Sequence, residues 1–527
     1  MTDQGERIFL YGPPGSGKSS LGQALARRLD LPFWDVDREI EQASGKPIPQ
    51  IFTAEGEAGF RRRENQALHN LPDNGSAVIA LGGGALLDER NRRLVEGQGR
   101  VLCLAASLNV LHQRLASAQS ERPLISTGEG NTQRVNIRDL ENLLSRRAEH
   151  YNSFALRIDT GPLSLEETLE KIQGLLGRFR VWGMGKAYDV LAQPGALSQI
   201  GLQFERLGLS GPAVIVSDEN VAPLYLEGVK QALLDRDIPV SALAIPPGEK
   251  YKTVATVERL WTFFLESGLE RSGVVLALGG GVVGDLAGFA GATYMRGVSW
   301  IALPTSLLAM CDASLGGKTG ADLPQGKNLV GAFHPPRLVL ADPVTLTTLP
   351  EPELRSGMAE VIKAGVIGDP ELFALCRRGW PAHQAQWSEI VRRSMAVKIS
   401  VIEADPYEKD LRACLNLGHT IGHALELLSG FSLRHGEAVA IGMVAEARLA
   451  ENSGLAQVGL AEQIIRALKQ FDLPVKLPAN LGLDTLYQTM TTDKKRAGGK
   501  LRFALPVRVG EVLPHHTLSK EHLWTLF

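Results

Sequence analysis

Cysteine is scarce in this sequence, and neither sign of charge is in excess. The four cysteines, Cys103, Cys311, Cys376 and Cys414, are far apart and form no Cys-x-x-Cys pair. This spacing argues against a disulfide framework and a thiolate zinc cluster, and it predicts a protein of the reducing cytoplasm. The 56 Lys and Arg residues nearly balance the 58 Asp and Glu residues, for a net charge of -2. We therefore expect no nucleic-acid partner, because binding a phosphate backbone would need a basic excess.

Signals for export or membrane insertion are also missing. The first residues, MTDQGERIFLYG, have no basic segment followed by a long apolar core, so we expect no secretory signal. The most apolar stretch, residues 273–295, is rich in glycine and carries Asp285, which a bilayer-spanning helix would not tolerate well. We expect no membrane association. A hydrophobic fraction of 44% and a charged fraction of 22% over 527 residues indicate a globular protein of roughly three or four folding units.

Hydrophobic patterning divides the chain into three predicted regions. Residues 1–176 alternate strand-like runs such as RIFLY, AVIAL and RVLCLAA with helical patterns, which is typical of a parallel α/β sheet with helices on both faces. Residues 177–345 repeat this alternation, which predicts a second, Rossmann-like α/β domain. Residues 346–527 show long helical patterns and few strand signals, so we expect an α-helical domain.

A glycine-rich loop, GPPGSGKS at residues 12–19, follows the first strand-like run and precedes a helical pattern. Such a loop is typical of nucleotide-binding proteins, since its backbone N–H groups converge on phosphate oxygens at a helix N-terminus. Lys18 would add a positive charge, and the Ser19 hydroxyl would bind magnesium. A purely structural loop is the alternative. The predicted nucleotide-binding residues are Gly15, Ser16, Gly17, Lys18, Ser19 and Ser20.

Two carboxylates and two arginines are candidates for a second substrate in the same region. Asp35 and Asp37 end the run FWDVD, and open α/β sheets bind ligands beyond the carboxyl ends of their strands. One could orient magnesium and the other accept a substrate hydroxyl, or both could be solvated carboxylates at a helix start. Arg61 and Arg147 could each clamp a carboxylate through the guanidinium fork, although a lone arginine is more often a surface charge.

Histidines gather in one window of the helical region. His419 and His423 are four residues apart and share a helix face, so their spacing nominates both as metal ligands, with His435 and a carboxylate from another helix completing the set. A pair of core histidines without a metal is the alternative. Glu360 and Lys363 lie three apart on an otherwise apolar helical pattern, where unpartnered charges would be costly.

Glycines and basic residues suggest a cofactor and a phosphorylated substrate. Gly279, Gly280 and Gly281 follow a strand-like run, where they allow either close approach to a pyrophosphate or tight packing. Several polar or basic residues lie in Gly-rich, apolar surroundings, which favours a phosphate-bearing ligand; they are Arg296, Lys318, Lys327, Asn328, Lys363, Lys398 and Arg412.

The first 175 residues or so resemble shikimate kinase. The motifs GPPGSGKSS, DVD, GEAGFRRRE, LGGG and ERPL stand in the expected order, although the sequence from Arg147 reads RAEHY where the family has Arg-x-Pro-Leu-Tyr. The resemblance implies magnesium- and ATP-dependent phosphorylation of the shikimate 3-hydroxyl, with Lys18, Asp37 and Arg122 as catalytic residues and Arg122 in a lid. Shikimate would be held by Asp37, Arg61, Gly83, Gly84 and Arg147.

The following 345 residues or so resemble 3-dehydroquinate synthase. The motifs PPGEKYKT, GGGVVGDLAGFAGATYMRG, LGGKTG, GKNLVGAFHPP, SGMAEVIK, LNLGHTIGHA and HGEAVAIGM stand in sequence. The resemblance implies zinc or cobalt held by Glu360, His419 and His435, so that His423 becomes a neighbouring catalytic residue rather than a ligand. NAD would be bound by Asp218, Glu249, Lys252, Gly280, Gly281, Asp285, Thr305 and Ser306.

The substrate implied by this resemblance is 3-deoxy-arabino-heptulosonate 7-phosphate. Lys318, Lys363 and His423 would be catalytic, and Lys494 or Lys495 would reach into the site. The NAD would take up a hydride and return it, phosphate would be eliminated, and ring opening with aldol closure would give 3-dehydroquinate. The resemblance also implies a homodimer formed through the synthase half. The substrate-binding set would be Arg296, Asp312, Lys318, Lys327, Asn328, Lys363, Lys398, Arg412 and Asn416.

Other functions compete with this interpretation. The second half could be a polyol dehydrogenase or a cyclase for another sugar phosphate, and the first half could be a non-catalytic P-loop module. The basic residues argue against the dehydrogenase, and the intact phosphate loop argues against the non-catalytic module. We therefore expect a bifunctional enzyme of the shikimate pathway.

Overall fold

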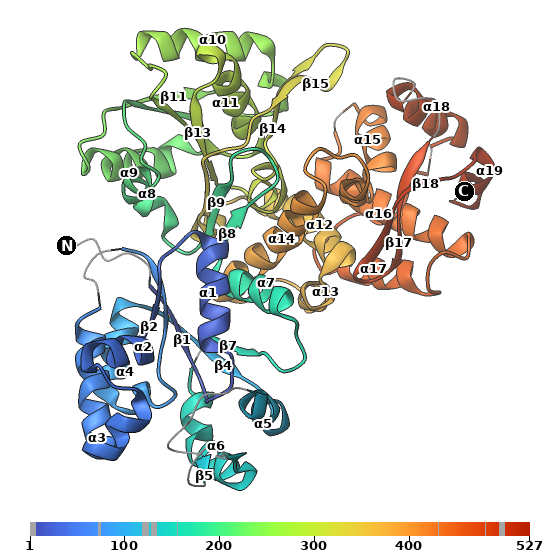
Figure 1. Cartoon of the computed structure of the whole chain (residues 1–527). Helices are drawn as coiled ribbons and strands as arrows, with labels where there is room; N and C mark the ends of the chain where they lie inside the picture. The colour runs from blue at the N-terminus through green and yellow to red at the C-terminus, as the bar shows by residue number, and fades with distance from the viewer. Residues whose placement is uncertain are drawn as a thin grey trace. The chain divides into compact units, whose positions relative to one another are not determined.

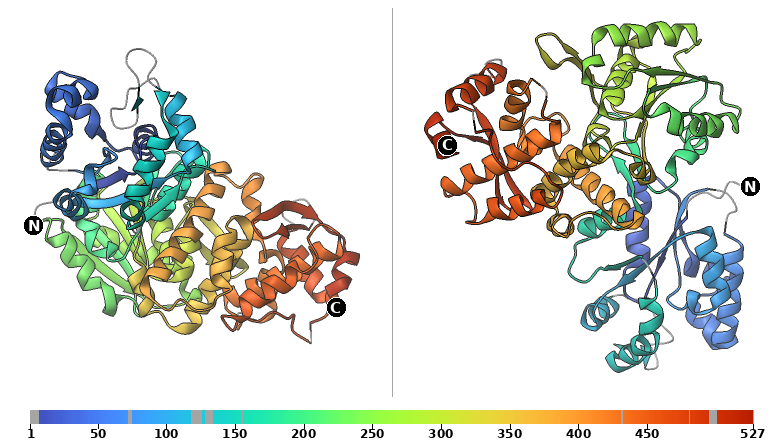
Figure 2. Two further views of the ribbon diagram at one scale, coloured as in Figure 1. Left: turned by 90° about the horizontal axis from the view of Figure 1, so that it is seen from below. Right: turned by 180° about the vertical axis from the view of Figure 1, so that it is seen from behind.

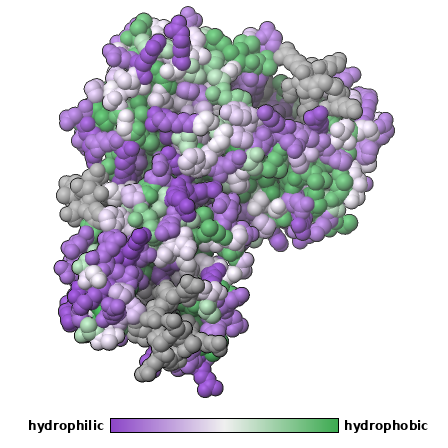
Figure 3. Space-filling view, in the orientation of Figure 1, coloured by the Kyte–Doolittle hydropathy of each residue, from purple (hydrophilic) through white to green (hydrophobic). Residues whose placement is uncertain are grey.

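The structure is a computed structural model that describes residues 7–71, 75–117, 126–127, 134–154, 156–430, 432–479, 481–494 and 501–526, with only the backbone at 126–127, 134–135 and 492–494. The chain separates into two compact units, Met1–Leu176 and Gly177–Phe527. None of the helices in the described part of the chain has both the length and the apolar character needed to cross a membrane. Hydrophilic residues cover much of the face shown in Figure 3, and its apolar patches are scattered between them.

The described strands of the first unit form a parallel five-stranded sheet in the order β2-β3-β1-β4-β7, with the short β5–β6 hairpin outside it. Strands β1 and β3 are buried along their whole length and β4 is buried over Val101–Leu104, whereas β2 and β7 are partly exposed; this unit is coloured blue to teal in Figure 1. Their bounds are Arg7–Tyr11 (β1), Phe33–Asp35 (β2), Ala77–Ala80 (β3), Gly99–Ala105 (β4), Ser126–Thr127 (β5), Arg134–Val135 (β6) and Leu156–Asp159 (β7).

Helices cover both faces of this sheet, as the sequence predicts. Ile8 and Leu10 of β1 pack with the apolar residues of α1 and α7, whereas Phe9 and Tyr11 pack with residues of α2, α3, α4 and α6. This alternation follows from the two-residue period of a strand. The helices are Lys18–Leu29 (α1), Val36–Ser44 (α2), Ile48–His69 (α3, bent at Gly56), Glu89–Gln98 (α4), Leu108–Ser117 (α5), Ile137–Asn152 (α6) and Leu165–Leu176 (α7).

The second unit begins with a larger α/β layer. Its described strands form a seven-stranded sheet, β11-β10-β12-β13-β16-β9-β8, that is parallel except for the edge strand β8. Helices α8 and α9 pack on one face, and α10 and α11 pack on the other. The bounds are Arg178–Val181 (β8), Tyr188–Ala192 (β9), Ala213–Asp218 (β10), Val240–Ile245 (β11), Val274–Gly279 (β12), Ser299–Pro304 (β13), Leu338–Ala341 (β16), Ile200–Arg206 (α8), Ala222–Leu234 (α9), Val254–Glu266 (α10) and Gly281–Thr293 (α11).

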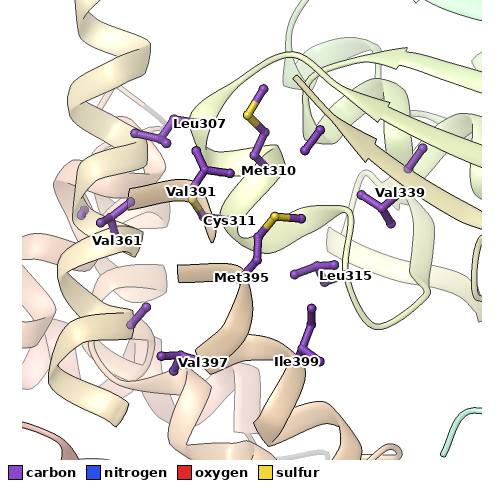
Figure 4. Packing of buried hydrophobic residues seen from close by; sticks show 14 of the residues in the cluster. Leu307, Met310, Cys311, Leu315, Val339, Val361, Val391, Met395, Val397 and Ile399 are labelled. Carbon is purple, nitrogen blue, oxygen red and sulfur yellow. The ribbon is translucent and has the colours of Figure 1, made fainter. Parts of the chain in front are cut away.

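A hairpin and a group of helices complete the second unit (Figure 2). The hairpin pairs β14 (Lys318–Leu323) with β15 (Gly326–Phe333). The core joins the sheet to the helices, because Leu307, Met310 and Cys311 pack against Val391 and Met395 of α14 (Figure 4). The helices are Glu351–Gly368 (α12), Pro370–Cys376 (α13), Gln384–Ala404 (α14), His419–Leu428 (α15), His435–Asn452 (α16), Leu460–Lys469 (α17), Leu483–Lys494 (α18) and Lys520–Leu523 (α19).

The C-terminal region is not purely helical. Strands β17 (Arg502–Arg508) and β18 (Glu511–Thr517) form an antiparallel hairpin that packs on α15 and α16 through residues such as Phe503 and Leu505. The expectation of a helical domain missed this hairpin. Its strands are short and contain Pro506 and Pro514, and proline inside a run weakens the signal for a strand.

Candidate active sites

The glycine-rich loop of the first unit connects β1 to α1 and lines a cavity of about 410 Å³. Gly17 caps α1 at a φ of 91°, a conformation that favours glycine. A Cβ at Gly12 would lie 2.3 Å from the carbonyl oxygen of Leu104, so this position also needs glycine. Lys18 Nζ donates to the carbonyl oxygens of Gly12 and Pro13, at 2.9 and 3.0 Å. The lysine therefore lies over its own loop.

The two aspartates after β2 have different surroundings. Ser19 Oγ donates to Asp35 Oδ2 at 2.6 Å, and Asp35 Oδ1 accepts from the backbone N–H of Asp37 and caps α2. Asp37 instead lies beside Gly82, where an added Cβ would be 3.2 Å from Asp37 Oδ1. The geometry thus pairs Asp35 with Ser19, the predicted magnesium ligand. Asp37 lies instead next to the LGGG segment.

Glu64 is a buried carboxylate that sequence reasoning missed. It lies 2.6 Å from Arg61, and Arg61 also contacts Glu57 at 3.2 Å. Burial raises the pKa of Glu64 although Arg61 is next to it. The signal in the sequence was the i,i+3 spacing from Arg61. A Cβ at Gly82 would lie 2.3 Å from Glu64, and one at Gly84 would lie 2.4 Å from Arg61, so these glycines allow the charged pair to approach the segment.

The carbonyl oxygen of Gly83 accepts hydrogen bonds from side chains of β1 and α6. Tyr151 donates to it at 2.7 Å, Arg147 at 3.3 Å and Tyr11 at 3.3 Å. The structure therefore brings Arg147 and Tyr151 to the LGGG segment, despite the altered residues between them. Arg122, the predicted lid arginine, lies outside the described residues.

In the second unit, the predicted cofactor residues gather at the carboxyl ends of neighbouring strands. Asp218 ends β10, Gly279 ends β12, and Thr305 follows β13. The backbone N–H of Thr305 donates to the carbonyl oxygen of Gly279 at 3.0 Å, and a Cβ at Gly280 would lie 3.5 Å from Ser306 Oγ. This edge, together with the N-terminus of α11, is where α/β sheets bind nucleotides.

A buried lysine joins this edge to the β14–β15 hairpin. Lys252 Nζ lies 2.5 Å from Asp285 Oδ2 and donates to Asn328 Oδ1 at 2.5 Å. Burial would lower the pKa of Lys252, but Asp285 and Glu249 raise it. Lys327 lies 3.5 Å from Glu249. The hairpin therefore carries Lys327 and Asn328 to the predicted NAD residues.

Three helices bring Glu360, His419 and His435 to one point. Glu360 Oε1 on α12 lies 3.3 Å from His435 Nε2 on α16 and 3.7 Å from His419 Nε2 on α15. Ligands about 2.0 Å from a tetrahedral zinc ion lie about 3.3 Å from one another, so the spacing fits a metal. Glu360 is buried, and neither carboxylate oxygen accepts a well-formed hydrogen bond from the described residues. One carboxylate and two imidazoles are also the donor set of a catalytic zinc site.

His423 does not join this group. It lies within ligand distance of Glu426 and His435 instead, and its ring centroid is 5.1 Å from that of His419. The nomination of both histidines from their spacing is thus not met by the geometry, because the ligand atom of His423 groups with those of Glu426 and His435 and not with those of Glu360 and His419. Glu426 was missed, although the 419, 423 and 426 spacing places it on the same helix face.

Buried lysines surround the metal-ligand group. Lys363 Nζ lies 2.5 Å from Glu360 Oε2 and donates to the carbonyl oxygen of Leu415 at 2.8 Å. Burial would lower the pKa of Lys363, but Glu360 and Asp312 raise it. Lys398 donates to Asp312 Oδ1 at 2.6 Å, and here burial prevails and lowers its pKa. The site therefore holds two cationic side chains away from bulk water.

The remaining predicted substrate residues lie on the loop before α15 and on β14. Glu408, which sequence reasoning missed, forms an ion pair with Lys318 and accepts from Asn416 at 3.2 Å. Arg412 is buried and donates to the carbonyl oxygen of Pro406 at 2.5 Å. Nothing in the local sequence distinguished Glu408 from a surface carboxylate.

Arg296 does not join the cluster. Arg296 is exposed just beyond the C-terminal end of α11, whereas the predicted cofactor glycines lie at its N-terminal end. Over the 13 residues of α11, this is a separation of about 20 Å. The side chains of Lys494 and Lys495 lie outside the described residues.

A cavity of about 310 Å³ opens beside the metal-ligand group. Asn416, His419 and His423 line one side, and the β17–β18 hairpin contributes Arg502 and His515. His515 has a φ of 57°, and its buried Nε2 has no hydrogen-bond partner among the described residues. Sequence reasoning missed His515 because it missed the hairpin.

Comparisons with known proteins match both units. The shikimate kinase family model matches residues 14–176, and models of the N-terminal and C-terminal parts of 3-dehydroquinate synthase match residues 242–356 and 357–496. The chain is 46% identical over 346 residues to 3-dehydroquinate synthase of Symbiobacterium thermophilum, covering 64% of this chain and 97% of that protein. It is 44% identical over 341 residues to the same enzyme of Synechocystis sp., covering 63% and 94%.

Solved structures resemble the second unit. The 2-epi-5-epi-valiolone synthase from Streptomyces hygroscopicus, solved with NAD⁺ and Zn²⁺ bound, is 29% identical with a TM-score of 0.59, covering 66% of this chain and 98% of that one. A 2-deoxy-scyllo-inosose synthase, complexed with carbaglucose-6-phosphate, NAD⁺ and Co²⁺, is 26% identical with a TM-score of 0.60 and the same coverage.

Proposed function

The chain belongs to the 3-dehydroquinate synthase family and also carries a shikimate kinase domain, and we propose that the two clusters described above are the active sites of these two enzymes. The protein is a bifunctional enzyme of the shikimate pathway. It phosphorylates shikimate with ATP, and it converts 3-deoxy-arabino-heptulosonate 7-phosphate to 3-dehydroquinate and phosphate. The convergence of Glu360, His419 and His435 from three helices carries the assignment of the synthase site.

In the kinase unit, the glycine-rich loop binds ATP. The backbone N–H groups at the start of α1 receive its phosphates, and Lys18 exchanges its loop carbonyl partners for phosphate oxygens. Ser19 and Asp35 bind magnesium directly or through water. Asp37 accepts the proton of the shikimate hydroxyl. Arg61 and Arg147, which both lie beside the LGGG segment, bind the shikimate carboxylate.

In the synthase unit, the residues fit both implied cofactors. Zinc held by Glu360, His419 and His435 supplies Lewis-acid polarisation of a substrate hydroxyl, and NAD supplies a reversible hydride acceptor. The protein binds the NAD pyrophosphate at Gly280 and Gly281.

The polar side chains around the ligand group handle the phosphorylated substrate. Lys363 and Lys398 are held in a buried site, where their charges stabilise developing negative charge more strongly than in water. Lys318 and Arg412 bind phosphate or carboxylate oxygens, with Lys318 released from Glu408. His423 lies beside the ligand group and moves a proton at a substrate hydroxyl.

The identity of the sugar phosphate follows from the relatives. The solved cyclases that act on other substrates share 26% and 29% identity with this chain, whereas the 3-dehydroquinate synthases share 44% and 46%. The basic residues around Lys398 suit a phosphorylated substrate. A polyol dehydrogenase, whose substrate carries no phosphate, would not need them. We therefore favour dehydroquinate formation over another cyclisation.

We also propose that the enzyme is a cytoplasmic homodimer. All four cysteines are free and buried, as suits a reducing compartment. Arg296 is exposed about 20 Å from the cofactor glycines of its own chain, which favours its use in the site of a second copy. Mixing Arg296→Ala with Lys363→Met tests this: two weakly active variants should complement each other only if Arg296 serves the partner's site. No recovery after subunit exchange would contradict the proposal.

Phosphate release from 3-deoxy-arabino-heptulosonate 7-phosphate tests the synthase reaction. With catalytic NAD, we expect release without accumulation of NADH, loss of activity on chelation and recovery with zinc. Stoichiometric NADH would indicate a dehydrogenase, and no phosphate would refute the substrate. ATP turnover with shikimate in the same sample is the matched control, because Lys363→Met should sharply lower only phosphate release and Lys18→Ala only ATP turnover.

A further inference from the structure

His435 uses both of its ring nitrogens. Nε2 lies 3.3 Å from Glu360 Oε1, on the side of the metal-ligand group. Nδ1 lies 3.5 Å from Glu426 Oε1, on the opposite side of the ring. Glu426 is on α15, one turn beyond His423, and its side chain is only 5% exposed. A nearly buried carboxylate therefore lies behind a proposed metal ligand.

The same oxygen of Glu426 has a second cationic neighbour. Lys327 Nζ lies 3.5 Å from Glu426 Oε1 and also 3.5 Å from Glu249 Oε1. Lys327 belongs to β15, next to the proposed NAD residues, whereas Glu426 belongs to the helical region. The Glu249–Lys327–Glu426–His435 series thus connects the cofactor-binding layer to the metal-ligand group.

We propose that Glu426 is a positioning residue that orients His435 for the metal, an inference that rests on the proposed synthase site. By accepting the Nδ1–H of His435, Glu426 fixes the tautomer in which the Nε2 lone pair faces Glu360 and the ion. Metal-binding histidines commonly present their second nitrogen to a carboxylate in this way, which fixes the ring and strengthens the ligand. Lys327 holds the carboxylate in place and offsets the cost of burying it.

A second metal ion is the competing explanation for this cluster. His423, Glu426 and His435 also lie within ligand distance of one another. However, His435 is shared with the first group, and the ammonium of Lys327 already lies beside the oxygen that the second ion would need. Because a divalent cation there would be repelled by Lys327, the observations favour a positioning role for Glu426.

Zinc binding to Glu426→Gln tests the proposal without an activity assay. Competition with a chromogenic chelator should show zinc bound on the order of 10- to 100-fold more weakly than by the wild type, at one ion per chain. The matched control is Lys327→Gln, which removes the neighbouring cation but leaves Glu426 facing His435. Its zinc affinity should change far less than that of Glu426→Gln.

Several outcomes would overturn the proposal. Wild-type zinc affinity in Glu426→Gln would refute the positioning role, and two zinc ions per wild-type chain with one in the variant would establish the second site instead. Equal losses in both variants would assign the effect to the ion pair with Lys327. Shikimate kinase activity reports that the first unit of each variant is intact, and cooperative thermal unfolding of the second unit reports the same for the unit that carries Glu426. If Glu426→Gln does not fold, Glu426→Asp replaces it, because it withdraws the carboxylate by only one methylene. Glu426→Asp should bind zinc more weakly than the wild type, by less than the roughly 10- to 100-fold loss expected for Glu426→Gln.

The test separates this inference from the proposed function. Failure of the wild type to release phosphate from the heptulosonate would refute the reaction, whereas zinc affinities would still report on Glu426. Conversely, an active enzyme whose zinc affinity ignores Glu426→Gln would refute only the positioning role.

Discussion

Replacing Gly436 with alanine should displace one metal ligand without touching it. Gly436 follows His435 at the start of α16, where that helix meets α12, the helix that carries Glu360. The backbone N–H of Gly436 donates to Ser356 Oγ at 3.0 Å. A Cβ at this position would lie 2.0 Å from the carbonyl oxygen of Ser356. The clash is with backbone, so a side-chain rotation cannot relieve it.

The size of the effect follows from this contact. Ordinary van der Waals separation would require the two helices to move apart by on the order of 1 Å. We expect overpacking to cost about 1–3 kcal/mol, partly offset by about 0.5–1 kcal/mol from replacing a helical glycine. A misplacement of about 1 Å in a catalytic site can lower kcat by on the order of 100-fold. Zinc affinity should fall as well, because His435 moves with the helix.

Phosphate release, zinc affinity and thermal unfolding of the purified variant check this prediction. The control is Gly228→Ala in α9, where an added Cβ meets no atom within 4 Å among the described residues. That substitution should stabilise the protein slightly and leave the synthase unchanged. Wild-type kcat and zinc affinity in Gly436→Ala would refute the argument that close contact between α12 and α16 sets the ligand geometry.

Three further predictions concern other parts of the chain. Lys18→Ala should lower the rate of shikimate phosphorylation by on the order of 100- to 1000-fold, with phosphate release by the synthase unit as the unchanged control. Backbone N–H groups, including that of Arg412, hold the pKa of Asp405 at about 2, so its stabilising effect is present above the ordinary pKa near pH 4 and is lost as pH falls toward 2. Urea unfolding should therefore show Asp405→Asn to be less stable than wild type at pH 6, and a constant difference down to pH 2 would contradict this. His515→Leu should be as stable as the wild type, because Nε2 has no hydrogen-bond partner among the described residues to lose. If that nitrogen binds substrate, the variant should raise KM for the heptulosonate about two- to ten-fold. An unchanged KM would show that His515 does not bind the substrate.

The local sequence was sufficient for features whose residues are contiguous. The phosphate loop is one strand, one loop and one helix, so its pattern predicts its structure, and the backbone confirms the helix beginning at Lys18. The alternation of apolar runs likewise predicts the parallel sheet with helices on both faces. These features depend on the periods of strands and helices, which neighbouring residues alone determine.

Tertiary structure decided which distant side chains meet. Spacing nominated His419 and His423 as ligands, but the packing of α12, α15 and α16 directs Glu360 and His435 to His419 and leaves His423 beside Glu426. The roles of Glu426 and Lys327 depend on the approach of the β14–β15 hairpin to α15. Helical spacing determines which residues share a helix face. Which residues that face contacts depends on how the helices pack, and α12 and α16 pack closely because Gly436 has no side chain. Such contacts join residues far apart in the chain, so a local pattern does not contain them.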